Sequence, residues 1–165
     1  MKKILAFSVF MIAFTVGAFA QTNSATATAT AVIVSPITIT QTADMSFGNI
    51  IPDADGGTVV LVPAATRTLN GLTSPSIVGT ITAASFTVTG LSGATYAISL
   101  PANHTINDGG NSMVVDTFTS TPSGTGTLTG GTETLNVGAT LNVGAAQPAG
   151  TYTNAAGFTV TVNYN

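Results

Sequence analysis

The chain has 165 residues, of which 44% are hydrophobic and only 5% are charged, and its formal net charge is −3 at pH 7. Two of its three cationic side chains, Lys2 and Lys3, belong to an N-terminal leader, which leaves Arg67 alone in the rest of the chain. This balance excludes a basic groove for nucleic acid and a basic patch for anionic lipid, and the absence of cysteine excludes stabilisation by disulfides.

Residues 1–20 have the pattern of a secretory signal peptide. A positive start at Lys2 and Lys3 precedes the apolar stretch Ile4 to Val16, which is too short for a lasting membrane span, and Ala18 to Ala20 supply small residues for cleavage. Cleavage is expected between Ala20 and Gln21, with no stable membrane span left afterwards. The sequence therefore predicts export to the periplasm, the cell surface or the extracellular space.

The remainder is predicted to be all-β. No useful helical period follows Gln21, whereas period-two alternation recurs between turn signals. Strand-like runs occupy Ala25–Thr40, Thr58–Val62, Ser76–Thr82, Ala84–Thr89, Ala94–Leu100, Met113–Thr119, Thr125–Thr129, Thr132–Val137, Thr140–Val143 and Phe158–Tyr164. This spacing predicts an immunoglobulin-like or Greek-key β-sandwich over residues 36–165, preceded by a strand or extension over residues 21–35.

The first alternating segment has two interpretations. Its apolar face carries small side chains followed by one large one, namely Ala25, Ala27, Ala29, Ala31 and Ile33. A row of alanines buries little apolar area, at about 25 cal/mol per Å². The segment is either the first strand of this chain's own sheet or a donor strand that completes the sheet of a neighbouring copy.

Three glycine-rich segments predict tight turns, at residues 53–57, 107–111 and 130–131. Asp53 to Gly56 also resembles the start of a calcium loop. The closing bidentate glutamate of such a loop is missing, so we expect an ordinary turn.

No residue pattern points to catalysis, a cofactor or a metal. The only imidazole, His104, lies in a segment that we expect to be an exposed polar loop, and no nucleophile motif accompanies it. A glycosidase would need two carboxylates and usually aromatic platforms, yet the chain has no Trp. The available carboxylates are Asp44, Asp53, Asp55, Asp108, Asp116 and Glu133. We therefore expect a protein that is not an enzyme.

A six-residue repeat stands out late in the chain, where Thr134–Ala139 is followed by the identical Thr140–Ala145. Two copies are too few for a stacked β-helix. We expect two short strands joined at Gly138 and Ala139.

The last strand alternates to the end of the sequence, with Phe158, Val160, Val162 and Tyr164 on one face. It carries no Lys, Pro or other device that blunts a free strand edge. We predict that this strand offers its edge to another strand, from this chain or from a second one.

The C-terminal residues resemble a known closing motif. Pro148–Asn154 followed by Phe158–Tyr164 is similar to the Gly-x-Tyr corner and final strand of spore coat protein U domains and archaic chaperone-usher pilins. A closer resemblance, carried by Asp44–Gly48, Ala84–Gly90 and Leu135–Ala139, is to a secreted bacterial domain-of-unknown-function (four-four-zero-two) family.

The pilin resemblance implies an immunoglobulin-like sandwich that lacks its last strand. A periplasmic chaperone and then the N-terminal extension of the next subunit would fill the resulting groove. On this resemblance Ala25 to Val34 is the donor strand, and Phe158, Val160, Val162 and Tyr164 line the acceptor and chaperone-binding edge.

We therefore predict an exported structural subunit of a pilus-like or other surface assembly, with copies of itself and a chaperone as partners. The alternative is a self-contained secreted binding module for a glycan or another surface ligand, because a surface rich in hydroxyls and amides pairs with sugar hydroxyls. A threonine array for ice or mineral, at Thr26, Thr28 and Thr30 or at Thr125, Thr127 and Thr129, is a third class.

Overall fold

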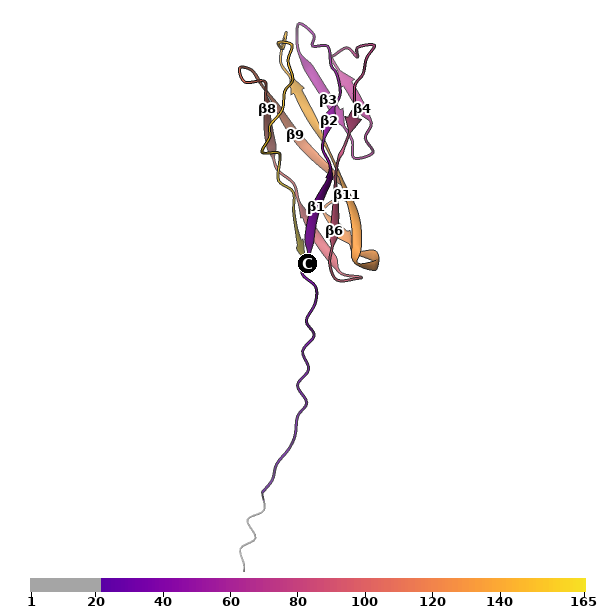
Figure 1. The fold of residues 1–165 in the computed structure, drawn as a ribbon, viewed down its shortest axis with the longest axis vertical. Coiled ribbons are helices and arrows are strands. Elements are labelled where there is room, and N and C mark those ends of the chain that lie inside the picture. Colours follow the sequence, from indigo (N-terminus) through magenta and orange to yellow (C-terminus); the bar gives the residue numbers. More distant parts are fainter. Residues whose placement is uncertain (1–21) are drawn as a thin grey trace, which may run out of the picture. The chain divides into compact units, whose positions relative to one another are not determined.

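A computed structural model describes residues 22–165, so the predicted signal peptide and its cleavage site between Ala20 and Gln21 lie outside the described residues. The prediction of an all-β protein is confirmed (Figure 1). The described residues form twelve strands and one short 3₁₀ turn, η1, at Thr129–Gly131. Within residues 22–165 there is no helix whose length and apolar character would let it cross a bilayer.

The chain divides into two units, with the boundary between Val32 and Ile33. Residues 22–37 belong to no strand, and the first strand, β1, covers Thr38–Ala43. The expected strand-like run Ala25–Thr40 is therefore wrong for all residues before Thr38. The predicted donor or first-strand residues Ala25, Ala27, Ala29, Ala31 and Ile33 are all exposed.

The larger sheet is entirely antiparallel and is built around one long strand. In the order β1–β6–β11–β3–β4 it contains β1, β6 (Ala84–Thr89), β11 (Thr132–Val143), β3 (Gly57–Leu61) and β4 (Arg67–Asn70). The hairpin of β8 (Asn103–Asn107) and β9 (Ser112–Thr121) joins it through pairing of β9 with β11.

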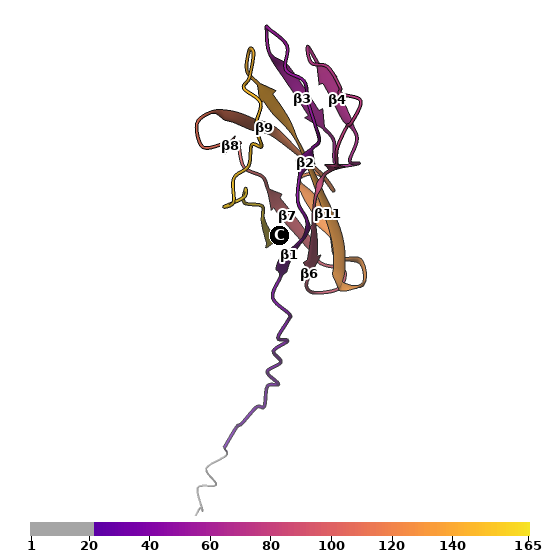
Figure 2. The same ribbon diagram turned by 45° about the horizontal axis from the view of Figure 1, so that its top comes forward.

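A smaller sheet has the order β10–β7–β12, with β10 at Thr125–Thr127, β7 at Thr95–Ser99 and β12 at Thr161–Tyr164. A third pairing joins β2 (Ser46–Phe47) to β5 (Ile81–Thr82). The views in Figures 1 and 2 both place the C-terminal end of β12 beside the start of β1.

The repeat region is one continuous strand, so the expected break at Gly138 and Ala139 is wrong. One edge of β11 pairs with β6 as far as Val137 and with β3 from Ala139 onward, while its other edge pairs with β9. Gly138 lies at this junction, where the backbone after Leu61 passes over it. The glycine thus serves close packing of two backbones rather than a turn.

Two groups of buried side chains form the interior. The first core lies between β6 and β11 on one side and β7 and β12 on the other; it contains Ala84, Val88, Tyr96, Leu128, Leu135, Val137, Val160 and Val162. The second core contains Val59, Met113, Val115, Ala139, Leu141 and Val143, all from β3, β9 and β11. Only the first core has regular strands on both sides. Besides side chains from β4, β8 and β9, the second core is covered by Met45, Phe47, Ile50, Leu72 and Tyr152, of which only Phe47 lies in a strand.

The predicted glycine turns are present. Asp108 closes the turn between β8 and β9, where its carboxylate accepts hydrogen bonds from the backbone N–H groups of Gly110 (2.9 Å) and Asn111 (2.6 Å). These bonds lower the pKa of Asp108 to about 2. The turn at residues 53–57 lies between β2 and β3, and nowhere in the described part of the chain do three or more His, Asp or Glu side chains cluster to hold a metal ion.

Candidate functional site: a crevice beside the last strand

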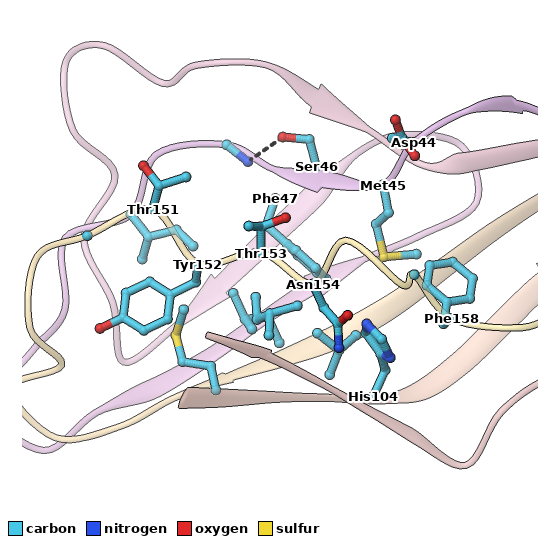
Figure 3. A pocket seen from close by; sticks show the side chains of 18 of the residues that line it. Asp44, Met45, Ser46, Phe47, His104, Thr151, Tyr152, Thr153, Asn154 and Phe158 are labelled. Carbon is cyan, nitrogen blue, oxygen red and sulfur yellow. Dashed lines mark hydrogen bonds between the residues drawn. The ribbon is translucent and has the colours of Figure 1, made fainter. Parts of the chain in front are cut away.

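A crevice of about 1080 Å³ lies over the second core. One side is formed by residues 44–50 and the other by residues 147–158, while Met113, Val115 and Leu141 form an apolar floor. Figure 3 shows these two sides facing each other across the space. Neither side is a regular strand for most of its length, so the second layer of the domain is incomplete here.

Side chains alternate in direction along the first side, over β2 and the two residues before it. Met45 points into the crevice and Asp44 points away from it (Figure 3), and both Met45 and Phe47 pack against the second core. Arg67 on β4 holds this segment in place by donating hydrogen bonds to the carbonyl oxygen of Phe47 and to Ser74 Oγ. Arg67, the one Lys or Arg among residues 22–165, therefore has a structural role.

The opposite side, residues 147–158, is irregular but well anchored. The hydroxyl of Tyr152 donates to the carbonyl oxygen of Pro148 (2.8 Å) and accepts from Nε2 of Gln147 (3.0 Å). Thr153 forms an isolated antiparallel bridge to Asn107, the last residue of β8. Nδ2 of Asn154 donates to the carbonyl oxygen of Thr105 at 2.9 Å. The bonds of Thr153 and Asn154 attach the segment to the outer edge of β8.

Phe158 marks the point where the two cores meet. Its ring centroid lies 4.9 Å from that of Phe118, 6.5 Å from that of Phe86 and 6.0 Å from that of His104. His104 is a half-buried residue of β8 whose ring meets Phe158 edge to face. The expectation of an exposed loop histidine is therefore wrong, because β8 continues the sheet through this residue.

The predicted edge residues come together in the first core. Val160 and Val162 are buried, and Phe158 and Tyr164 are partly buried against them. The regular strand begins only at Thr161, later than the predicted start at Phe158. One edge of β12 pairs with β7, and no other strand of residues 22–165 pairs with its second edge.

Tyr164 ties the end of β12 to the start of the domain. Its hydroxyl donates to the carbonyl oxygen of Ser35 (2.9 Å) and accepts from the N–H of Leu91 (2.6 Å). β1 and β12 approach each other at this end, whereas the crevice separates residues 44–50 from residues 147–158 at the other end. The space between the two segments thus widens away from the C-terminus.

Sequence reasoning did not find the floor and the first side of the crevice. The signal was present in Met45 and Phe47, two large apolar residues at alternate positions beside polar Asp44 and Ser46. Of the two, only Phe47 lies in a strand, and that strand, β2, is only two residues long, which is too short for periodicity to reveal it.

The model of the domain of unknown function DUF4402 matches residues 37–164. The chain belongs to this family. The DUF4402 match begins one residue before β1 and ends at the last residue of β12, so it contains every strand and leaves residues 22–36 outside. Neither the curated proteins nor the solved structures contain a match to this chain.

Proposed function

We propose that this DUF4402 protein is an exported, non-enzymatic structural subunit that assembles at the cell surface by β-strand complementation. The incomplete second layer carries the proposal: β12 and β2 each pair with a single strand, and a crevice with an apolar floor lies along β2 and along residues 147–158, which lead into β12. An added strand gains main-chain hydrogen bonds from such an edge and places alternate side chains in the space beneath.

The strand order supports an immunoglobulin-like sandwich with one strand missing. Such a sandwich has sheets A–B–E–D and C–F–G. The neighbours β1, β6, β11 and β9 correspond to A, B, E and D, and the pair β7 and β12 corresponds to C and F. Strand G would lie beside β12 on the edge that no strand of residues 22–165 occupies.

Tyr152 supports the same assignment. In immunoglobulin-like domains a tyrosine near the start of strand F bonds back to the backbone a few residues upstream. Tyr152 lies between β11 and β12, and its hydroxyl donates to the carbonyl of Pro148 at 2.8 Å. This hydrogen bond, which we call the tyrosine corner, fixes the path by which the chain approaches the last strand.

Residues 22–34 have the composition of a donor strand. The segment carries no charge and alternates strictly from Ala25 to Ala31. Val32 and Ile33 are 80% and 98% exposed, although both are large and apolar. Insertion into the crevice of a second copy would bury such side chains, at about 25 cal/mol per Å² of apolar area.

The test is the state of assembly of the exported chain with and without its extension. We expect the full chain to form polymers, and the chain lacking Gln21–Thr30 to remain a folded monomer. Sedimentation and circular dichroism separate these outcomes. If the full chain is monomeric at high concentration and the deletion changes nothing, the proposal is wrong. A periplasmic chaperone, as the proposed earlier occupant of the same edge, should co-purify with the deletion variant.

A self-contained binding module is the second candidate, because a crevice of about 1080 Å³ is large enough for a small ligand. The expected ligand is a neutral glycan, since Asp44 is the one charged residue that borders the crevice. Saturable binding of a neutral oligosaccharide to a permanently monomeric chain would favour the module over the subunit.

A further inference from the structure

The outer face of the larger sheet carries threonines in register across β1, β6 and β11. Ile39, Val88 and Leu135 lie on the inner face of these strands, against the first core, so the residues beside them in the sequence point outward. Six outward side chains form two rows of three, which are Thr38, Thr89 and Thr132, and Thr40, Thr87 and Thr134. We call these six residues the threonine grid.

The grid is regular in both directions. The pairing of β6 with β11 has no register shift, and the shift between β1 and β6 comes only after Gln41, beyond the grid. The hydroxyl oxygens of Thr38 and Thr89 lie 2.7 Å apart, which confirms that neighbours in a row touch. The hydroxyls therefore repeat about every 4.8 Å across the strands and about every 6.8 Å along them.

The grid is uncharged and has no aromatic side chain. Glu133 is the one charged residue of β1, β6 and β11, and its carboxylate lies on the inner face, where it accepts from the N–H of Thr127 at 2.8 Å. Phe86 is the one aromatic residue of these strands, and it packs against the first core. A partner that matches this face in charge is neutral, and it gains nothing from stacking on rings.

A rigid and ordered partner suits the grid better than a soluble one. A hydroxyl in water exchanges one hydrogen bond for another, so a single contact contributes little. Threonine is stiff at χ1, and the strands fix its position, so the six hydroxyls lose little freedom when they bind together. Their methyl groups add apolar area to the same contact. The favoured partner therefore presents a repeating lattice of neutral hydrogen-bonding groups.

We propose that the threonine grid binds ice. Ice is a neutral solid of hydrogen-bonded water, and the oxygen spacings on its prism planes are close to the two repeats of the grid. A crystalline polysaccharide is the other neutral lattice, but a flat sugar surface is usually held by aromatic rings, and the grid has none.

Alternation in the sequence pointed to other threonine rows. Residues 26, 28 and 30 belong to no strand, and Thr129 lies in η1, so it does not continue the row of Thr125 and Thr127 on β10. The grid was missed because its rows join residues from three distant segments, and only the strand pairing brings them together.

Thermal hysteresis, the gap between the melting and freezing temperatures of an ice crystal in the protein solution, tests the proposal on the purified chain. We expect wild type to show a gap and Thr87→Tyr to lose it, because Thr87 lies between Thr40 and Thr134 and a larger side chain there holds the ice surface away. Thr134→Tyr should cause the same loss. Thr127→Tyr on β10 is the matched control and should keep the gap.

All three variants should melt at the wild-type temperature, since tyrosine suits an outward strand position as well as threonine does. A wild-type chain without thermal hysteresis, or an equal loss in the control, would overturn the proposal. Sedimentation of the chain with crystalline cellulose or chitin, without hysteresis, would overturn it in favour of a polysaccharide. The measurement needs only a single chain, so its outcome does not depend on strand exchange.

Discussion

Gly138→Ala tests the close crossing of backbones at the centre of β11. A Cβ atom at this position would lie 2.7 Å from the carbonyl carbon of Val62 and 2.9 Å from the nitrogen of Pro63, and it would also meet the carbonyl oxygen of Leu61. These are backbone atoms, which cannot rotate away as a side chain can. The strain should match that of an overpacked core, about 1–3 kcal/mol of unfolding free energy.

Urea unfolding of the purified variant measures this loss, and the melting temperature should fall by roughly 4–12 °C for a domain of this size. Gly110→Ala is the matched control, since the nearest atom to its Cβ would be Asp108 Oδ1 at 3.9 Å. That variant should be neutral or slightly more stable, because alanine restricts the unfolded chain. Equal stability of the two variants would show that β11 does not cross the backbone after Leu61 as described.

Three further predictions concern other parts of the domain. Val162→Asp should eliminate soluble protein, because it buries an unpaired charge in the first core, while Asn163→Asp on the exposed face should accumulate normally in the same expression assay. Tyr152→Phe removes the hydrogen bond from the tyrosine hydroxyl to the carbonyl oxygen of Pro148, so it should lower the unfolding free energy by about 1 kcal/mol in urea titrations. An unchanged unfolding free energy would show that this hydrogen bond does not stabilise the domain. The pKa of Asp108 is lowered to about 2 from its ordinary 3.8, so its contribution to stability is complete above pH 4 and is lost as the pH falls toward 2. Melting temperatures of Asp108→Asn should therefore fall less steeply than wild type over that range, and parallel curves would contradict the assignment.

The all-β class and the positions of many strands followed from the sequence, because period-two alternation and glycine turns are local signals. The burial of Val160 and Val162 was predictable for the same reason, since both belong to the apolar set of the alternating sequence, although β12 itself begins only at Thr161. Of the two family resemblances read from the sequence, the one to the domain-of-unknown-function (four-four-zero-two) family is confirmed by the DUF4402 match.

Other features depend on contacts between distant residues and were wrong or missed. Gly138 looked like a turn residue, yet pairing with β6, β3 and β9 keeps the strand continuous through it. His104 looked like a loop residue because its neighbours are polar, and only the pairing of β8 with β9 places it in a strand. The crevice needs residues 44–50, 147–158 and the floor of β9 and β11 together, and no local pattern links these segments.

The two cores would have separate roles in a strand-exchanged assembly. The first core has strands on both sides within one chain and contains Val160 and Val162, so it should hold the domain folded before any donor arrives. The second core has only irregular cover on its crevice side, and a donor would complete it. Binding to the folded state raises stability by RT ln(1 + [L]/Kd), so the polymer should melt above the monomer by an amount set by the donor's affinity. Ile33→Ala should therefore lower the melting temperature of the polymer while leaving that of the monomer unchanged, and Val162→Ala should lower both.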